Sequence, residues 1–205
     1  MKVIVTGGAG FIGSHLTKDL VEKDYEVIVI DNLSMGKRSR VSKKAKFYEI
    51  DICSDEISEI FKKEKPDYLL HLAAIPRVPI SVKTPAKTTK VNVFGTANLL
   101  QASVNSGIKR VVFASSSSVY GDQEQFPLKE SMTPSPISPY GLQKLQGEQL
   151  AQLFSGDIYN LPVVSLRYFN VYGPELDFES DYSLVLGKFL RLSKKGKEKL
   201  QEFLI

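Results

Sequence analysis

The feature that most constrains the fold of this chain is a glycine-rich turn close to its first residue. Residues 6–13 read Thr-Gly-Gly-Ala-Gly-Phe-Ile-Gly, after an apolar run at residues 3–5 and before apolar residues at helical spacing. This order predicts a strand, a tight turn and a helix. Gly7, Gly10 and Gly13 suit a tight turn, a close approach of backbone to a phosphate, and close packing of helix on strand. The N–H groups that open such a helix favour an anion.

An acidic residue follows the turn where a dinucleotide site requires one. Asp31 ends a second apolar run, residues 26–30, and lies 18 residues beyond Gly13. A carboxylate here accepts hydrogen bonds from both hydroxyls of an adenosine ribose and repels a 2′-phosphate, so the sequence predicts NAD rather than NADP. A structural turn with Asp31 as a cap is the alternative, and Lys37 and Arg38 in the next loop leave NADP open.

The composition is that of a globular protein, with 42% hydrophobic and 24% charged residues in 205. The net charge of +4 comes largely from lysines near the C-terminus, which we interpret as a solvated helix face, so no nucleic-acid partner is expected. Cys53 is the single cysteine and fits a reducing compartment. We see neither a signal peptide nor an apolar run long enough to span a membrane, so a cytoplasmic location is expected.

Strand and helix patterns alternate along the chain. Apolar strand-like runs occupy residues 2–6, 26–30, 46–50, 68–72, 109–114 and 163–168. Helical patterns occupy residues 11–23, 54–63 (capped by Ser54), 85–106 and 139–154, and the proline-rich stretches between 76 and 85 and between 126 and 139 read as loops. The alternation predicts an α/β fold with a doubly wound parallel sheet of the Rossmann type, in strand order 3-2-1-4-5-6.

Tyr140 and Lys144 form the pair with the clearest chemical meaning. They stand at i and i+4 in a predicted helix and therefore share one face. A lysine cation near a phenol stabilises the phenolate and lowers the tyrosine pKa towards neutrality, which makes Tyr140 a candidate general base. Ser116 follows the fifth strand and would hydrogen-bond the same substrate hydroxyl. An ordinary surface pair is the alternative.

Two polar residues lie within apolar segments. We interpret His71 as a core histidine with satisfied hydrogen bonds rather than a ligand or base, and neither histidine has a partner at metal-ligand spacing, so no metal is predicted. Asn92 lies mid-helix among apolar neighbours, and we expect its amide to hydrogen-bond loop backbone near the cofactor.

These residues resemble a known family, the extended short-chain dehydrogenase/reductase proteins. The chain is similar to the NAD-dependent sugar-nucleotide epimerases and dehydratases, most of all the UDP-glucose 4-epimerase group. The matching motifs cover residues 1 to about 175: the turn at 6–13, Asp31 to Ser34, Asp51-Ile52, His71 to Ala74, Asn92 with Gly95-Thr96, Ser115 to Gly121, Tyr140 with Lys144, and Arg167 to Pro174.

The resemblance implies roles for particular residues. Tyr140 would be the base, Lys144 would hold the nicotinamide ribose, and Ser116 would complete a catalytic triad. Substrate contacts would come from Ser116, Ser117, Tyr140 and Asn170. The implied contacts to NAD are Gly7, Gly10, Phe11, Ile12, Gly13, Asp31, Asn32, Ser34, Asp51, Ile52, Leu72, Ala73, Ala74, Asn92, Ser115, Tyr140, Lys144 and Tyr168.

The implied reaction is epimerisation of a nucleotide sugar of the UDP-glucose/UDP-galactose type. Hydride leaves carbon 4 of the sugar for NAD, the 4-keto sugar turns over in the site, and hydride returns to the other face. Dehydratases of this family carry two acids after the triad serine or threonine, where this chain has Ser117 and Ser118, so dehydration is disfavoured. The relatives dimerise through two long helices, which correspond to residues 85–106 and 139–155 here, so a homodimer is expected.

The chain departs from the family in its length. Members usually have about 300 residues or more, and the remainder builds a domain that closes over the substrate. We therefore expect an NAD-binding Rossmann domain at 1–174, and at 175–205 a short remnant of the substrate domain or a helical tail. A truncated piece, a shortened gene product and a compact relative all stay open. The alternative to an enzyme is a non-catalytic NAD-binding module without a complete substrate site.

Overall fold

The computed structural model describes residues 1–174. The chain divides into two compact units, Met1–Tyr168 and Phe169–Ile205. The first unit is fully described, whereas only residues 169–174 of the second are. The predicted content of residues 175–205 lies outside the described residues, and the predicted domain division stays a prediction. None of the helices in the described part of the chain is both long and apolar enough to cross a membrane.

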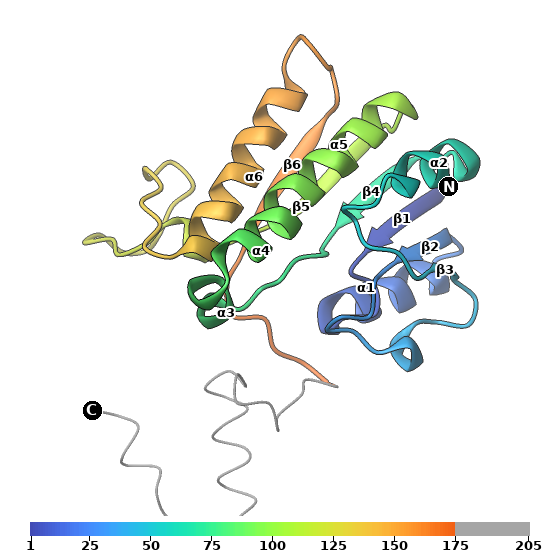
Figure 1. Ribbon diagram of the computed structural model, residues 1–205, viewed down its shortest axis with the longest axis horizontal. Coiled ribbons are helices and arrows are strands. Elements are labelled where there is room, and N and C mark those ends of the chain that lie inside the picture. The colour runs from blue at the N-terminus through green and yellow to red at the C-terminus, as the bar shows by residue number, and fades with distance from the viewer. Residues whose placement is uncertain (175–205) are drawn as a thin grey trace, which may run out of the picture. The chain divides into compact units, whose positions relative to one another are not determined.

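The first unit is built on one parallel sheet of six strands (Figure 1). Their order is β3-β2-β1-β4-β5-β6, which confirms the predicted Rossmann topology. The sheet reverses direction of growth between β1 and β4, the point at which such folds bind ligands. The strands are β1 (Lys2–Thr6), β2 (Glu26–Ile30), β3 (Lys46–Tyr48), β4 (Tyr68–His71), β5 (Arg110–Ser116) and β6 (Val163–Tyr168).

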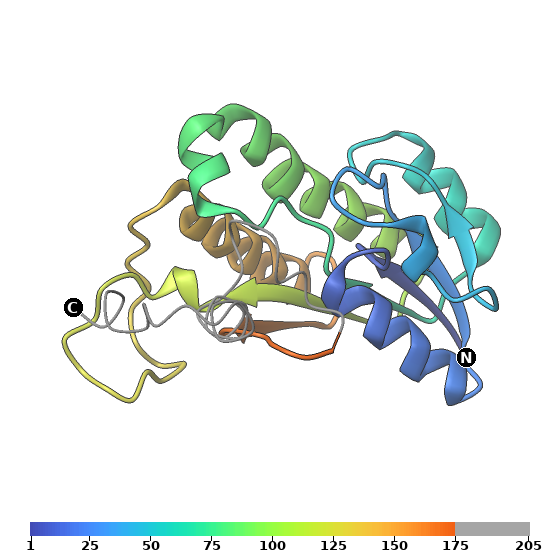
Figure 2. The ribbon, with the colours of Figure 1, turned by 90° about the horizontal axis from the view of Figure 1, so that it is seen from below.

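Helices cover both faces of the sheet, and this explains why the central strands are apolar throughout. Val3 and Val5 of β1 pack on one face with α1 (Phe11–Glu22). Ile4 packs on the other face, in a cluster with apolar residues of α2 (Glu56–Glu64), α5 (Gly95–Asn105) and α6 (Pro139–Ser155). Figure 2 shows α1 on one side of the sheet and the three other helices opposite.

The predicted helix over residues 85–106 contains an irregular turn. It begins as α4 (Pro85–Thr89), passes through a π-helical turn, η2 (Lys90–Phe94), and continues as α5. A π-helical turn inserts an extra residue into the helix and is common at functional sites. Two short 3₁₀ helices are η1 (Arg38–Arg40) and η3 (Ser117–Val119).

Several predicted boundaries are wrong in detail. The proline-rich stretch after residue 76 is not an irregular loop throughout, because it contains α3 (Val78–Lys83) with a proline in its first turn, where the missing N–H costs nothing. β3 ends at Tyr48 rather than residue 50, and β5 continues to Ser116. The N-cap of α2 is Asp55, not Ser54, although the Ser54 hydroxyl accepts a hydrogen bond from the Glu56 amide (3.2 Å).

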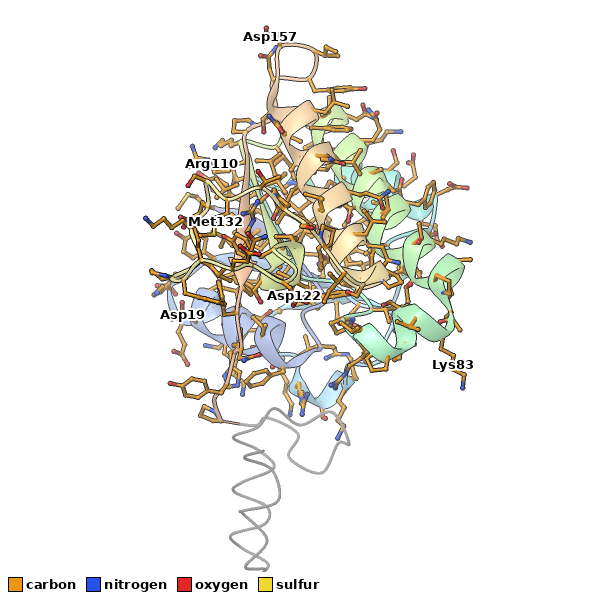
Figure 3. The ribbon with its side chains drawn as sticks, turned by 90° about the vertical axis from the view of Figure 1, so that its left-hand side faces the viewer. Asp19, Lys83, Arg110, Asp122, Met132 and Asp157 are labelled. Atoms are coloured by element: carbon orange, nitrogen blue, oxygen red, sulfur yellow. The ribbon has the colours of Figure 1, made fainter. Side chains whose placement is uncertain are left out.

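The parallel register brings the predicted site residues to one edge of the sheet. Thr6 is opposite His71 at the ends of β1 and β4, and Ser116 is opposite Tyr168 at the ends of β5 and β6. Helix α6 packs against η3, directly after Ser116. In Figure 3, Asp157 marks the turn after α6 at the top, and the helix runs down from there towards the level at which Asp122 is labelled.

Candidate cofactor and active site

The glycine turn has the geometry that its sequence predicts. Gly7 has φ of +73°, and a Cβ there would lie 2.7 Å from the Ala73 amide nitrogen. A Cβ on Gly13 would collide with the carbonyl oxygen of Gly7, so α1 packs on the turn at a distance that only glycine allows. These positions therefore fix a close contact between the ends of β1 and β4 and the start of α1.

The start of α1 can hold an anion. Gly10 is its N-cap residue, and no side chain caps the first turn. The N–H groups of Phe11, Ile12 and Gly13 belong to this first turn, which has no earlier turn to supply carbonyl partners. The turn and the helix dipole fit the pyrophosphate of a dinucleotide.

Asp31 is nearly buried and holds the turn in place. Its Oδ2 accepts a hydrogen bond from the Ala9 amide (3.0 Å) and its Oδ1 accepts one from the Leu33 amide (2.8 Å). Each carboxylate oxygen has a second lone pair, so both can still accept ribose hydroxyls. Asp31 thus has the turn role that was part of the alternative, and its binding of a ribose stays a prediction.

Asn32 and Asp51 form a polar pair beside the Asp31 loop. The Asn32 amide donates to Asp51 Oδ2 (2.8 Å), and its oxygen accepts from the Ser34 amide (3.0 Å). Burial raises the pKa of Asp51, but hydrogen bonds from the Cys53 amide and Asn32 outweigh it, so the pKa of Asp51 lies below its usual value. This pair orders the region where an adenine is predicted to lie.

His71 is a core residue with both ring nitrogens satisfied, as predicted. Nδ1 lies 2.8 Å from Thr6 Oγ1, and Nε2 lies 2.9 Å from Thr96 Oγ1. The Thr96 hydroxyl donates to the Asn92 carbonyl (2.7 Å), so Nε2 carries the proton and Nδ1 accepts from Thr6. Thr6 Oγ1 in turn accepts from the Ala73 amide (3.3 Å). Burial lowers the pKa of His71 to about 3, with a smaller contribution from Lys144.

Asn92 makes the loop contacts that the sequence predicts. Its Oδ1 accepts from the Ile75 amide (2.8 Å), and its Nδ2 donates to the Ile75 carbonyl (3.2 Å) and to Gln143 Oε1 (2.8 Å). Gln143 also donates to Thr88 Oγ1 (2.9 Å). The π-helical turn therefore ties the loop after β4 to α6, one residue before Lys144.

Tyr140 and Ser116 come together from α6 and β5. Both are only 9% exposed. Burial raises the pKa of Tyr140, and a hydrogen bond between its hydroxyl and Ser116 lowers it; the net shift is upward. The net direction is opposite to the predicted one, because burial outweighs the contribution of Ser116.

Lys144 is 4% exposed, and its amine is hydrogen-bonded to the backbone of β5. Its Nζ donates to the Ala114 carbonyl (2.7 Å), lies 4.9 Å from the centre of the Phe113 ring and 5.9 Å from the centre of the Tyr140 ring. Burial lowers its pKa to about 8. The pair is thus internal, not a surface pair.

The remaining predicted residues occupy varied positions. Ser115 donates its hydroxyl to Glu148 (2.5 Å), so its one donor hydrogen is already used, and its contact to a cofactor stays a prediction. Tyr168 is half-buried, and burial raises its pKa. Asn170 belongs to the second unit, and its role stays a prediction. Leu72, Ala73 and Ala74 follow β4 beside the glycine turn. Among the described residues, no three or more histidines, cysteines or acids gather into a group suited to a metal.

Sequence reasoning assigned no role to Thr6 and Thr96, although both lie in the matching motifs, and missed Gln143 and Glu148. The first three act through partners far apart in sequence, which no local pattern reveals. Glu148 had a signal, because the spacing that links Tyr140 to Lys144 continues four residues further.

Comparison with known proteins identifies the family. A model of the NAD dependent epimerase/dehydratase family matches residues 3–204. This chain belongs to that family. The UDP-glucose 4-epimerase of Lacticaseibacillus casei is 42% identical over 174 residues, which are 84% of this chain and 52% of that protein.

Solved structures of epimerases in this family share the fold. The UDP-glucose 4-epimerase of Thermotoga maritima, solved with UDP-glucose, is 42% identical with a TM-score of 0.92, over 97% of this chain and 64% of that one. The enzyme of Thermus thermophilus, solved with NAD, is 38% identical with a TM-score of 0.86, over 96% and 64%. This chain spans about half the length of the curated relatives it matches.

Proposed function

We propose that this chain carries the NAD-binding and catalytic residues of a nucleotide-sugar 4-epimerase of the UDP-glucose/UDP-galactose type. The single observation that supports this most is that Tyr140, Ser116 and Lys144 are all buried at the sheet edge that also bears the glycine turn, with Tyr140 and Lys144 on one face of α6. Relatives that are epimerases, one solved with UDP-glucose and one with NAD, support the same reaction.

The predicted contacts to NAD are part of this proposal. The glycine turn and the first turn of α1 would hold the pyrophosphate, Asp31 the adenosine ribose, and Asn32 with Asp51 the adenine. When bound, NAD supplies the acceptor and donor of hydride at carbon 4 and the positive charge of its oxidised nicotinamide ring. The substrate contacts of Ser116, Ser117 and Asn170 are likewise proposed.

The chain's own residues would handle one proton. Tyr140 would take the proton from the sugar hydroxyl at carbon 4 and later return it to the same oxygen, while the Ser116 hydroxyl holds that oxygen by a hydrogen bond. Lys144 would hold the nicotinamide ribose. The raised pKa of Tyr140 means that this base needs added positive charge nearby, and a cationic Lys144 is one source.

The test is turnover of UDP-galactose, with UDP-N-acetylgalactosamine as a second substrate, by the NAD-saturated protein. We expect interconversion with the matching glucose epimer. Tyr140→Phe should lower kcat by about a thousandfold while NAD binding changes little, because the ring still fills its pocket. Full activity of Tyr140→Phe would contradict the mechanism.

A non-catalytic NAD-binding module is the second candidate, since the glycine turn, the start of α1 and Asp31 form a candidate cofactor site without any substrate contact. Bound NAD without turnover of any nucleotide sugar would support this reading. Failure to bind NAD would reject both candidates.

We also propose a homodimer through η2, α5 and α6. These helices lie side by side in Figure 1, and Phe94, Leu142 and Leu153 expose apolar side chains on them. A cytoplasmic location stays a prediction from the sequence.

A further inference from the structure

Glu148 lies on the same face of α6 as the proposed catalytic pair. It follows Lys144 by four residues and Tyr140 by eight, spacings that keep the three side chains on one side of a helix. Its side chain is largely buried, and its carboxylate is the acceptor at the centre of a group of contacts between α6 and the sheet.

Those contacts end on two strands at once. Glu148 Oε1 accepts from Ser115 Oγ (2.5 Å) and from Arg167 Nε (2.9 Å), and Oε2 accepts from Arg167 Nη2 (2.8 Å). Ser115 on β5 and Arg167 on β6 are opposite one another in register. The next register pair is Ser116 and Tyr168. The Glu148 carboxylate therefore joins α6 to β5 and β6 one residue before the strand ends that form the site.

Arg167 extends the connection to the segment after η3. Its guanidinium lies 4.6 Å from the centre of the buried Tyr120 ring, and its Nη1 donates to the Glu130 carbonyl (3.4 Å). The fork geometry of a guanidinium permits all of these contacts together, which an ammonium group could not make. The elements that carry Ser116, Tyr140 and Lys144 therefore meet at this ion pair.

Stability alone does not explain a largely buried ion pair such as this one well. Apolar side chains of similar volume often stabilise a protein as much or more, because two charges lose their hydration. What the pair supplies is a fixed direction and distance between α6 and the ends of β5 and β6. Small misplacements of a base relative to its substrate lower the rate strongly.

We propose that Glu148 is a positioning residue: through Ser115 and Arg167 it sets the distance between the Tyr140 and Ser116 hydroxyls. This inference rests on the proposed function, since it assigns Glu148 to the same reaction. Glu148 touches neither of the two hydroxyls and acts only through the elements that carry them.

The experiment compares Glu148→Gln with a matched control, Glu64→Gln. Glu64 is likewise buried and paired, accepting from Lys46 Nζ and from the Tyr48 hydroxyl (both 2.5 Å). It lies at the opposite edge of the sheet, beside the residue that begins β3. Both variants should lose stability in urea unfolding. An effect on kcat and on Tyr140 ionisation that only Glu148→Gln produces would therefore come from the position of the site residues and not from lost stability. Arg167→Lys is the milder second variant.

Two readouts on NAD-saturated protein decide the proposal. For Glu148→Gln we expect kcat to fall about tenfold with KM and NAD affinity within about threefold. We also expect the ionisation midpoint of Tyr140 to rise by about half a pH unit, because its hydrogen bond to Ser116 favours ionisation. The midpoint is measured from the rise of phenolate absorbance with pH, as the difference between wild type and Tyr140→Phe. The difference between Glu148→Gln and the double variant Glu148→Gln, Tyr140→Phe gives the midpoint of Tyr140 without Glu148. Arg167→Lys should shift both readouts in the same direction, and Glu64→Gln should shift neither.

Equal effects of Glu148→Gln and Glu64→Gln on both readouts would overturn the proposal, as would a wild-type midpoint in Glu148→Gln. A wild-type chain that binds NAD but turns over no nucleotide sugar would reject the proposed function instead. The ionisation readout still decides whether Glu148 positions Tyr140 in that case, because it needs no turnover.

Discussion

At the scale of single residues, burial opposes the charge states that the proposed chemistry needs. Burial raises the pKa of Tyr140 and lowers the pKa of Lys144 to about 8, so both groups are pushed towards their neutral forms. His71 is neutral for the same reason and serves structure through Thr6 and Thr96. A residue retained in an unfavourable charge state is typical of a site where function and stability conflict.

Lys144→Met should therefore stabilise the protein without cofactor at pH 7, by about 1 kcal/mol. Removing a buried charge is favourable, and leaving the Ala114 carbonyl without its donor partly offsets the gain. Urea unfolding measures the change. Lys62→Met, which removes an exposed lysine paired with Glu59, is the control and should change stability by less than about 0.5 kcal/mol.

The same substitution has a pH signature with a definite sign. Between pH 8 and the usual lysine value of 10.5, folded Lys144 holds fewer protons than unfolded Lys144, so stability rises with pH across this window. Lys144→Met should remove that rise, at most about 1.4 kcal/mol per pH unit. If Lys144→Met left the pH dependence of stability unchanged and lost stability at pH 7, burial would not lower the pKa of Lys144.

At the scale of elements, patterns along the chain predicted most of the fold. Apolar runs set the strands, and their alternation with helices fixed the strand order. The π-helical turn η2 and helix α3 could not be predicted, since the first depends on the Asn92 contacts across the fold and the second hides among prolines. The site was partly predictable: Tyr140 and Lys144 share a helix face by spacing, but the direction of the Lys144 amine depends on Ala114 and Phe113, which sequence spacing does not place.

The glycine turn offers the clearest prediction at this scale. In Gly13→Ala the new Cβ would overlap the Gly7 carbonyl and approach Gly8 Cα at 2.7 Å. Neither backbone group can rotate away, so α1 must move from the turn, with a loss of about 2 kcal/mol in unfolding free energy and of at least about tenfold in NAD affinity. Chemical denaturation and calorimetric titration measure the two losses.

Gly156→Ala is the matched control for that change. Gly156 follows α6, and a Cβ there would lie 3.3 Å from its nearest neighbour, the Leu153 carbonyl oxygen. It should leave NAD affinity unchanged and alter stability by no more than about 1 kcal/mol. If Gly13→Ala bound NAD as well as this control, the close packing of α1 on the turn would not matter for the cofactor.

At the scale of the whole molecule, binding of cofactor and turnover of substrate are separable. The first unit, Met1–Tyr168, contains the glycine turn, Asp31 and the Tyr140–Ser116 contact. Nucleotide-sugar turnover also needs binding energy from the substrate and exclusion of water. All the residues proposed to contact NAD lie in this unit, so NAD binding can be measured separately from turnover.

The last prediction concerns assembly through the helices beside the site. Leu142 and Leu153 lie three helical turns apart on α6, at 48% and 51% exposure, and Phe94 precedes α5 at 51%. Placing a charge at a central apolar contact costs several kcal/mol. Leu142→Glu combined with Phe94→Glu should therefore raise the dimer dissociation constant by roughly a hundredfold, measured by sedimentation, whereas Ile158→Glu, beyond the end of α6, should leave it unchanged.

A wild-type protein that sediments as a monomer at micromolar concentration would contradict the proposed homodimer. Dissociation by Ile158→Glu alone would instead move the interface to the turn after α6.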